Sequence, residues 1–173
     1  MAADETAMFR HDALFYDSTS DLVASTSPFL REGLELREEV VLACSDATRR
    51  AFSESLAADE RIRISYLPQG FCSRVPSAIG MMQSLMRERL EAGSGRVRLV
   101  AEIAVGEEDR NWKEWARVEA ACNQALSDFP LWKVCAYDSR ASSEEVLADA
   151  ELTHPQVRRG DVSEANPFYI EPK

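Results

Sequence analysis

VRLVAEIAV, at residues 97–105, is the clearest strand in the sequence, because branched and other apolar residues nearly fill it and Gly106 ends it. On its amino-terminal side, residues 77–90 have the apolar spacing of a helix. On its other side, the longest predicted helix covers residues 107–127, with acidic residues at 107–109, where the helix dipole favours them. A strand between two helices is the pattern of a parallel sheet with helical crossovers.

The same alternation extends over the rest of the chain. Serine or aspartate residues at 17–20, 45–46 and 142–143 can cap the helices that follow them. We therefore predict an α/β protein, a single three-layer domain over residues 1–173 with a mainly parallel central sheet and right-handed crossovers. The predicted core covers residues 9–155, and residues 156–173 are predicted to be an extended C-terminal tail on the surface. The remaining predicted strands are 13–16, 40–44, 61–67 and 131–137, and the remaining helices are 22–34, 47–56 and 143–152.

The charge balance excludes two classes of partner. Acidic residues outnumber basic ones, and the formal net charge is −10. Binding to nucleic acid or to an anionic membrane needs clustered Lys and Arg, so we expect neither partner. The pairs Arg49-Arg50 and Arg158-Arg159 are too short to form such a cluster and are predicted to lie in solvent.

Motifs that would indicate secretion, metal binding or common enzyme chemistry are missing. The N-terminus lacks the apolar segment of a signal peptide, so we expect a cytoplasmic protein. The four cysteines show neither a C-x-x-C pattern nor zinc-type spacing, so we expect reduced core thiols and no metal or other cofactor. The chain has no phosphate-binding loop, no G-x-G-x-x-G and no G-x-S-x-G, which disfavours nucleotide hydrolysis and serine-hydrolase chemistry.

Polar residues mark the ends of two predicted strands. Glu102 interrupts a run that otherwise has the composition of a strand buried on both faces, and a buried carboxylate is costly unless it is paired. It should therefore lie near the end of its strand, facing a polar partner or the crevice where open parallel sheets bind ligands. Tyr137 and Asp138 end the last clear strand. The alternatives are a structural ion pair for Glu102 and a turn or helix cap for Asp138.

The longest helix carries a second anomaly. Glu119 and Asn123 lie on the same face as the apolar Trp115, at four and eight residues beyond it. Two polar groups inside an apolar stripe need partners. They either bond the backbone of a neighbouring loop or line a ligand pocket.

His11 and His154 are the only histidines of the chain. They lie near its two ends and can meet only if the first strand and the last helix converge. Each is either a structural residue or part of a site. Together with Glu102 they would supply three metal ligands, but the spacing does not predict such a centre.

Five short motifs occur in a characteristic order and spacing: RHDALFY (10–16), Glu102, WARVEAACN (115–123), CAYD (135–138) and THP (153–155). Together they resemble the MEDS family of methanogen and methylotroph sensory domains of the DcmR type. The resemblance also includes the N-terminal domain of RsbA-type anti-sigma regulators. It implies a RecA/KaiC-like core that has lost its phosphate-binding loop, and a sensory role in transcriptional signalling with small hydrocarbon derivatives as ligands.

The expected function is a non-catalytic sensory module that binds a small organic ligand, a regulatory protein partner, or both. In relatives an output domain often follows the sensor, so here output is expected to pass through a partner such as a sigma/anti-sigma regulator or a sensor kinase. One alternative is an enzyme in which Glu102 or Asp138 acts as base and a histidine as acid. Another is a pure protein-interaction module, to which Phe168 and Tyr169 contribute. The predicted ligand-binding residues are His11, Tyr16, Glu102, Glu119, Asn123, Tyr137, Asp138 and His154.

Overall fold

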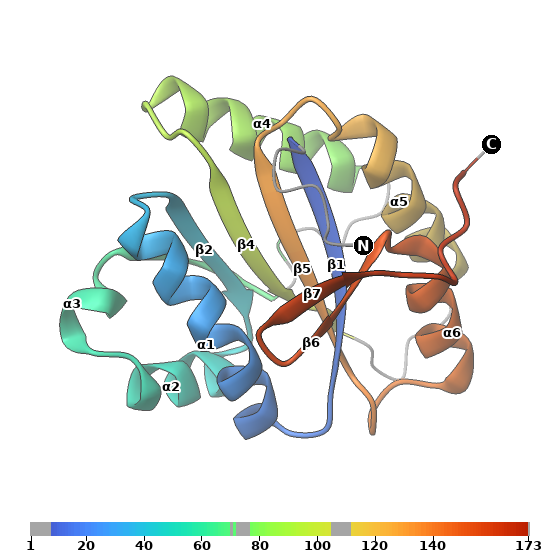
Figure 1. Cartoon of the computed structure of the whole chain (residues 1–173), viewed down its shortest axis with the longest axis horizontal. Helices are drawn as coiled ribbons and strands as arrows, with labels where there is room; N and C mark the ends of the chain where they lie inside the picture. Colours follow the sequence, from blue (N-terminus) through green and yellow to red (C-terminus); the bar gives the residue numbers. More distant parts are fainter. Residues whose placement is uncertain (1–7, 70, 72–76, 105–111, 173) are drawn as a thin grey trace.

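The structure, a computed structural model, describes residues 8–69, 71, 77–104 and 112–172. Within these residues, helices cover both faces of one central sheet (Figure 1). The strands are β1 (Phe9–Tyr16), β2 (Glu39–Cys44), β3 (Ile64–Pro68), β4 (Val97–Glu102), β5 (Leu131–Asp138), β6 (Gln156–Arg159) and β7 (Val162–Ala165). The helices are α1 (Thr19–Glu35), α2 (Asp46–Ser55), α3 (Ala58–Arg61), α4 (Ala78–Glu91), α5 (Trp112–Ala125) and α6 (Glu144–Thr153).

The strand order explains which helices cover which face. The described sheet has the order β3-β2-β4-β5-β1-β6-β7, and every neighbouring pair is parallel except β6 and β7. The chain first runs from β1 outward to β3 and then returns through β4 and β5 to β6. Right-handed crossovers place helices on opposite faces for the two directions. The predicted α/β class with a mainly parallel sheet is confirmed.

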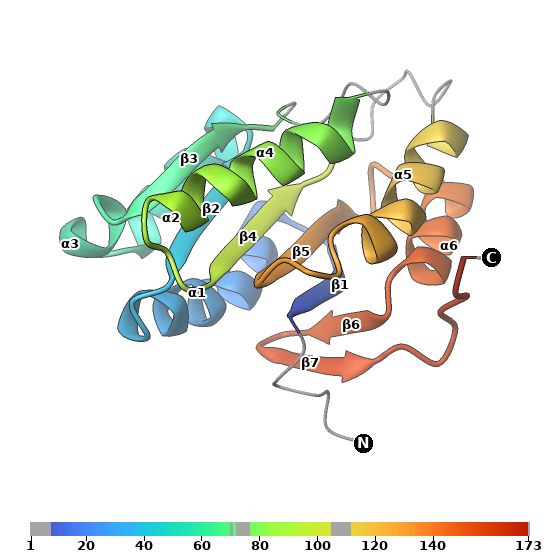
Figure 2. The ribbon, with the colours of Figure 1, turned by 90° about the horizontal axis from the view of Figure 1, so that it is seen from above.

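Each face of the sheet has its own apolar core. On one face, Leu30 of α1 and Phe52 of α2 pack against β-strand residues such as Leu42. On the other, Met86 of α4 and Cys122 of α5 pack against residues such as Leu99. Figure 2 shows α4 and α5 on one side of the strands and α1 on the other. None of the helices in the described part of the chain is long and apolar enough to cross a membrane.

Serine side chains start three helices, as predicted. Ser18, Ser45 and Ser143 each accept a hydrogen bond from a backbone N–H three residues further on. The predicted strand 97–105 is too long, because β4 ends at Glu102 and residues 103–104 are not in the strand. Its last predicted residue, Val105, and the predicted helix start at 107–111 lie outside the described residues.

The prediction for the C-terminal segment is wrong for residues 156–165. These residues form β6, which pairs with β1, and β7, which pairs with β6 at the sheet edge. Arg158 is consequently buried, contrary to the prediction, and its Nε lies 3.4 Å from a carboxylate oxygen of Asp12. The strands were missed because each has four residues, with a single apolar side chain in QVRR and two in VSEA.

Candidate functional site

The eight predicted site residues fall on the two faces of the sheet. His11 and Tyr16 both belong to β1 but lie five residues apart, so their side chains point to opposite faces. Tyr16, Glu102 and Asp138 end their strands and are called the edge group. The other five lie together on the opposite face of β1 and β5, and Lys133 and Cys135 lie among them. These seven residues are called the buried cluster: His11, Glu119, Asn123, Lys133, Cys135, Tyr137 and His154.

Glu102 is the centre of the edge group. One of its carboxylate oxygens accepts a hydrogen bond from the Ser45 backbone N–H at 2.7 Å, and the other accepts one from the Thr48 hydroxyl at 2.8 Å. The Tyr16 hydroxyl donates to the carboxylate at 3.5 Å. Glu102 therefore lies at the end of its strand and faces polar partners, as the sequence predicts, and it joins the ends of β1, β2 and β4.

Asp138 has the capping role that was one of its two alternatives. Its side chain accepts hydrogen bonds from the backbone N–H groups of Arg140 at 2.8 Å and Ala141 at 3.2 Å. It lies beside Tyr16 in the register of β1 and β5. Burial, and then the charges of Glu102 and Asp138, raise the pKa of the Tyr16 hydroxyl. The phenol therefore stays protonated and available as a donor.

The thiol of Cys44, next to the edge group, is predicted to react slowly with iodoacetamide in the folded protein. Burial, and then the charge of Glu102, raise its pKa from 9.0 to about 12. At pH 8 the thiolate fraction is then about a thousandfold lower than in the unfolded chain. The folded protein binds this proton more tightly than the unfolded chain does. The Cys44 contribution to the free energy of unfolding is therefore fully present below pH 9 and is lost as the pH rises from 9 to about 12.

Peptide mass spectrometry after alkylation at pH 8, with and without urea, measures this difference at Cys44. Equal labelling of Cys44 in the native and unfolded chains would contradict the raised pKa. A native labelling rate that keeps rising between pH 9 and pH 11 is the expected pH profile, since an ordinary thiol levels off near its pKa of about 8.5.

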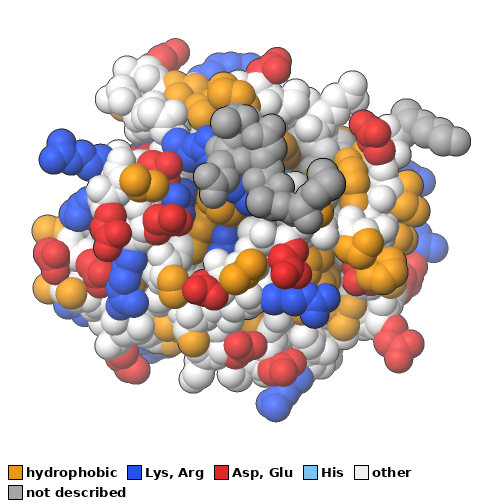
Figure 3. Space-filling view, in the orientation of Figure 1, with side chains coloured by type: hydrophobic (Ala, Val, Ile, Leu, Met, Phe, Trp, Pro, Cys, Tyr) orange, Lys and Arg blue, Asp and Glu red, His pale blue; other side chains and the backbone are white. Residues whose placement is uncertain are grey.

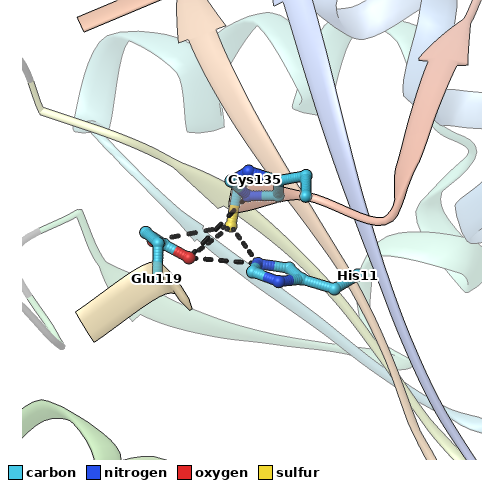
Figure 4. Close-up of side chains that lie close together, drawn as sticks. His11, Glu119 and Cys135 are labelled. Atoms are coloured by element: carbon cyan, nitrogen blue, oxygen red, sulfur yellow. Dashed lines mark hydrogen bonds and ion pairs between the residues drawn. The ribbon is translucent and has the colours of Figure 1, made fainter. Parts of the chain in front are cut away.

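In the buried cluster, four potential ligand groups come from four separate elements. His11 lies on β1, Glu119 on α5, Cys135 on β5, and His154 directly follows α6. All four are buried, and their ligand atoms lie within 4.8 Å of one another. Figure 4 shows the side chains of His11, Glu119 and Cys135 pointing toward one another. The first strand and the last long helix therefore do converge, and the two histidine ring centroids are 4.0 Å apart.

Glu119 makes the ionic contacts of the cluster. Its Oε2 lies 2.9 Å from Lys133 Nζ, 3.0 Å from His11 Nε2 and 3.7 Å from His154 Nε2. Burial disfavours ionisation of Glu119, but Lys133, and then His11 and His154, hold the pKa of this carboxyl well below its usual value. Burial likewise disfavours the Lys133 ammonium, but the acidic groups of Cys135 and Glu119 hold its pKa well above the usual value. Glu119 and Lys133 are therefore a buried ion pair.

Both histidines are fixed in one orientation by groups behind them. The Asn123 side-chain N–H donates to the Thr153 carbonyl at 2.8 Å, so its Oδ1, 2.9 Å from His11 Nδ1, is the acceptor. His11 Nδ1 therefore carries the proton. His154 Nδ1 lies 2.7 Å from the Ala150 carbonyl and carries a proton for the same reason. In the neutral rings, both Nε2 atoms then present a lone pair to the cluster.

Tyr137 closes the cluster on one side. Its ring packs edge-on against Trp112 and His154, and its buried hydroxyl has no hydrogen-bond partner among the described residues. Burial raises the pKa of this hydroxyl well above its usual value. Tyr137 is therefore protonated and packs mainly through its apolar ring, and its hydroxyl oxygen makes no hydrogen bond to the described residues.

The sequence analysis missed Lys133 and Cys135. In LWKVCAYD, Lys133, Cys135 and Tyr137 alternate on one face of β5, the face that α5 covers. A lysine in the middle of an otherwise apolar strand was the available signal, because a buried ammonium needs an acidic partner.

The edge group lies at the carboxyl ends of the strands, where the sequence analysis expected a site, whereas most of the buried cluster lies elsewhere. His11 and Lys133 pair in register as the third residues of β1 and β5, so they lie in the amino-terminal half of the strands. Helix α5 crosses back over the sheet, which places Glu119 above the middle of the strands instead of their ends. A surface groove lies elsewhere and contains none of the eight residues: its lining includes Leu67, Phe71, Met81, Leu85 and Arg89.

Comparison with known families identifies the chain. The sequence profile of MEDS, the methanogen/methylotroph DcmR sensory domain, matches residues 10–155. The chain belongs to this family. The predicted resemblance is thus confirmed, and the match covers both the edge group and the buried cluster. A comparison with curated proteins finds no match.

One solved structure supports the fold of this MEDS domain. A KaiC-like protein from the hyperthermophilic archaeon Pyrococcus horikoshii OT3 superposes with a TM-score of 0.57 at 12% identity, over 86% of this chain and 70% of that chain. The cytoplasmic domain of EssC gives 0.44 at 12% identity, over 85% of this chain and 29% of that one. The first likeness confirms the predicted RecA/KaiC-like fold. Membership of a sensory-domain family indicates a sensory or regulatory role for this chain.

Proposed function

We propose that this MEDS domain is a non-catalytic sensory module of cytoplasmic bacterial signal transduction that acts in transcriptional control of the sigma/anti-sigma type. The observation that carries the proposal is the match to a sensory-domain family over residues 10–155. The surface agrees with a role that does not involve nucleic acid. On the face drawn in Figure 3, Lys and Arg side chains are interspersed with Asp and Glu.

The edge group is the proposed site for a small organic ligand. Glu102 is half-buried and lies at the carboxyl ends of the strands, where open parallel sheets bind ligands. Its contact with the Tyr16 hydroxyl, at 3.5 Å, is the longest of its three hydrogen bonds. A ligand hydroxyl can replace that contact by accepting from the Tyr16 hydroxyl and donating to the Glu102 carboxylate, so binding would change how β1 and β4 are joined.

A regulatory protein partner is proposed to bind the C-terminal segment. Three large apolar side chains there are more than half exposed: Val162 at 52%, Phe168 at 58% and Ile170 at 62%. Phe168 and Ile170 are two residues apart, and the Ile170 backbone bonds that of Leu152, whose side chain is 38% exposed. Neighbouring exposed apolar side chains of this kind are typical of protein contact surfaces. Tyr169, between two of them, is half-buried.

The geometry favours this proposal over the acid–base enzyme. That alternative pairs Glu102 or Asp138 with a histidine, but Glu102 bonds Ser45, Thr48 and Tyr16 on the opposite face of the sheet from His11. The carboxylate that does contact His11 is Glu119, and both side chains are at most 1% exposed. A substrate would reach them only if the core opened.

A thermal-shift screen with small alcohols, ketones and halogenated methanes tests the ligand site. A compound present at about 100 times its Kd is expected to raise the Tm by roughly 5–10 °C. The shift should be lost in Glu102→Gln and retained in Glu114→Gln, a control on the exposed side of α5. An equal shift in wild type and Glu102→Gln would exclude the edge group, and the absence of any shift across these three classes would contradict the ligand proposal.

A further inference from the structure

We propose that the buried cluster binds one divalent transition-metal ion of the zinc type, through His11 Nε2, His154 Nε2, the Glu119 carboxylate and Cys135 Sγ. This inference does not depend on the sensory function proposed above, since it concerns the opposite face of the sheet from Glu102. It also goes against the sequence-based expectation of no metal. That expectation rested on spacing along the chain, and these four ligands come from four distant segments.

The distances between the four groups fit a tetrahedral centre. Zinc binds nitrogen and oxygen at about 2.0–2.2 Å and sulfur at about 2.3 Å, so neighbouring ligand atoms lie about 3.3–3.6 Å apart in a tetrahedron. Here Glu119 Oε2 is 3.0 Å from His11 Nε2, 3.7 Å from His154 Nε2 and 3.7 Å from Cys135 Sγ. His11 Nε2 is 3.4 Å from Cys135 Sγ. These four distances lie within about 0.4 Å of the tetrahedral spacing, and every pair of ligand atoms lies within 4.8 Å.

The two histidine nitrogens that face the centre of the cluster are poorly satisfied. His154 Nε2 is fully buried and has no hydrogen-bond partner among the described residues. His11 Nε2 presents its lone pair to a carboxylate oxygen only 3.0 Å away, which is repulsive unless a proton or a metal cation lies between them. A buried polar atom without a partner costs free energy, and a metal ion would satisfy both nitrogens at once.

The orientation of both rings suits metal binding. His11 Nδ1 and His154 Nδ1 each face an acceptor oxygen, so in the neutral rings the Nε2 atoms carry the lone pairs. Neutral imidazole is the form that binds a metal. Lys133 donates to Glu119 at 2.9 Å.

The groups behind the histidines are those expected around a metal. A histidine ligand almost always donates its other ring N–H to a carbonyl, a carboxylate or water, which fixes the ring. His11 donates to the Asn123 side-chain carbonyl, and His154 donates to the backbone carbonyl of Ala150. Lys133 orients the Glu119 carboxylate in the same way.

The set of two imidazoles, one carboxylate and one thiol selects the metal. Such nitrogen and sulfur ligands suit zinc and its neighbours, whereas magnesium and calcium prefer oxygen alone. On binding, the Cys135 thiol releases its proton to solvent, so the thiolate and Glu119 carry two negative charges beside the divalent ion, and Lys133 keeps its contact with Glu119. Four protein ligands leave no open position, which is the arrangement of a structural centre. Because the cluster is buried, the ion would enter as the chain folds.

Metal analysis and cobalt spectroscopy of the full chain test the site. Protein produced in zinc-supplemented medium should retain one ion per chain through gel filtration, as measured by plasma mass spectrometry. Protein produced with cobalt should show a thiolate-to-cobalt charge-transfer band and the visible bands of a tetrahedral ion. Replacing Asn123 by alanine, which frees the His11 ring, should weaken metal affinity by about 10–100-fold.

Two cysteine variants separate this site from other thiols. Cys135→Ala should lose the charge-transfer band and the bound ion, while Cys122→Ala should keep both. Cys122 is a matched control because it is also buried, on α5, but is not one of the four ligands. If Cys135→Ala does not fold, Cys135→Ser provides the same test with a side chain closer in size. Wild-type protein without bound metal, or a band that persists in the Cys135 variants, would overturn the proposal.

Discussion

Replacing Lys133 by methionine is expected to lower the free energy of unfolding of the metal-free protein by about 3–5 kcal/mol, the typical cost of breaking a buried ion pair. Lys133 Nζ and Glu119 Oε2 are 2.9 Å apart, and their side chains are 6% and 1% exposed. Without the ammonium, the Glu119 carboxylate would remain buried beside two neutral histidines. Methionine preserves the length and packing of the side chain, so the measured loss should come mainly from the missing charge.

Urea denaturation of chelator-treated protein measures this loss, and two further variants isolate its cause. The double variant Lys133→Met/Glu119→Gln should recover much of the stability, because removing both charges removes the unpaired one. Lys113→Met is the surface control, since Lys113 is 81% exposed and 3.8 Å from its partner Glu145. A Lys133→Met variant as stable as the Lys113→Met control would show that the buried pair contributes nothing.

The second large effect is expected from Asp12→Asn, again about 3–5 kcal/mol. Asp12 is fully buried on β1 and lies 3.4 Å from Arg158 Nε, whose side chain is 2% exposed. Arg158 also lies near the cations of Arg10 and Arg98, which disfavour its charge and make the carboxylate its essential partner. Asparagine can still accept the hydrogen bond from the Trp132 indole N–H, but its amide nitrogen would then face Arg158, so the variant removes both the charge and the acceptor on that side.

Hydrogen exchange should locate this second effect. Arg158 belongs to β6, so amides of β6 and β7 are expected to lose protection first, ahead of those in β2 and β4. Glu164→Gln on β7 is the control, because Glu164 is 62% exposed and pairs with Arg159 at 4.0 Å. Uniform loss of protection across the sheet would argue against a specific role of Asp12 in docking the β6–β7 hairpin.

The parts of the fold that depend on neighbouring residues were predictable from sequence. A serine that caps a helix bonds an N–H three residues away, so Ser18, Ser45 and Ser143 indicate their helix starts directly. The candidate site was predictable where a polar residue interrupts an apolar pattern. Glu102 and Glu119 were both identified in this way, and both make several polar contacts.

The parts that depend on distant residues were not predictable. Cys135 resembles an ordinary core thiol until the fold brings it to His11, 124 residues away along the chain. Asp12 and Arg158 gave no signal that they pair, because each looks like a surface charge in its own segment. The β6–β7 hairpin was missed for the same reason: β6 is stabilised by pairing with β1 instead of by an apolar pattern of its own.

The position of β1 between β5 and β6 has a consequence for how the chain folds. Phe9 pairs with Leu131, and Asp12 pairs with Gln156, so the first strand to leave the ribosome finds its neighbours only when most of the chain has been made. Contacts between residues so far apart slow folding, because a long loop must close before they can form. We expect β1 to stay unpaired while residues 17–130 are made, so its apolar end, Ala13–Tyr16, is the segment for chaperones to protect.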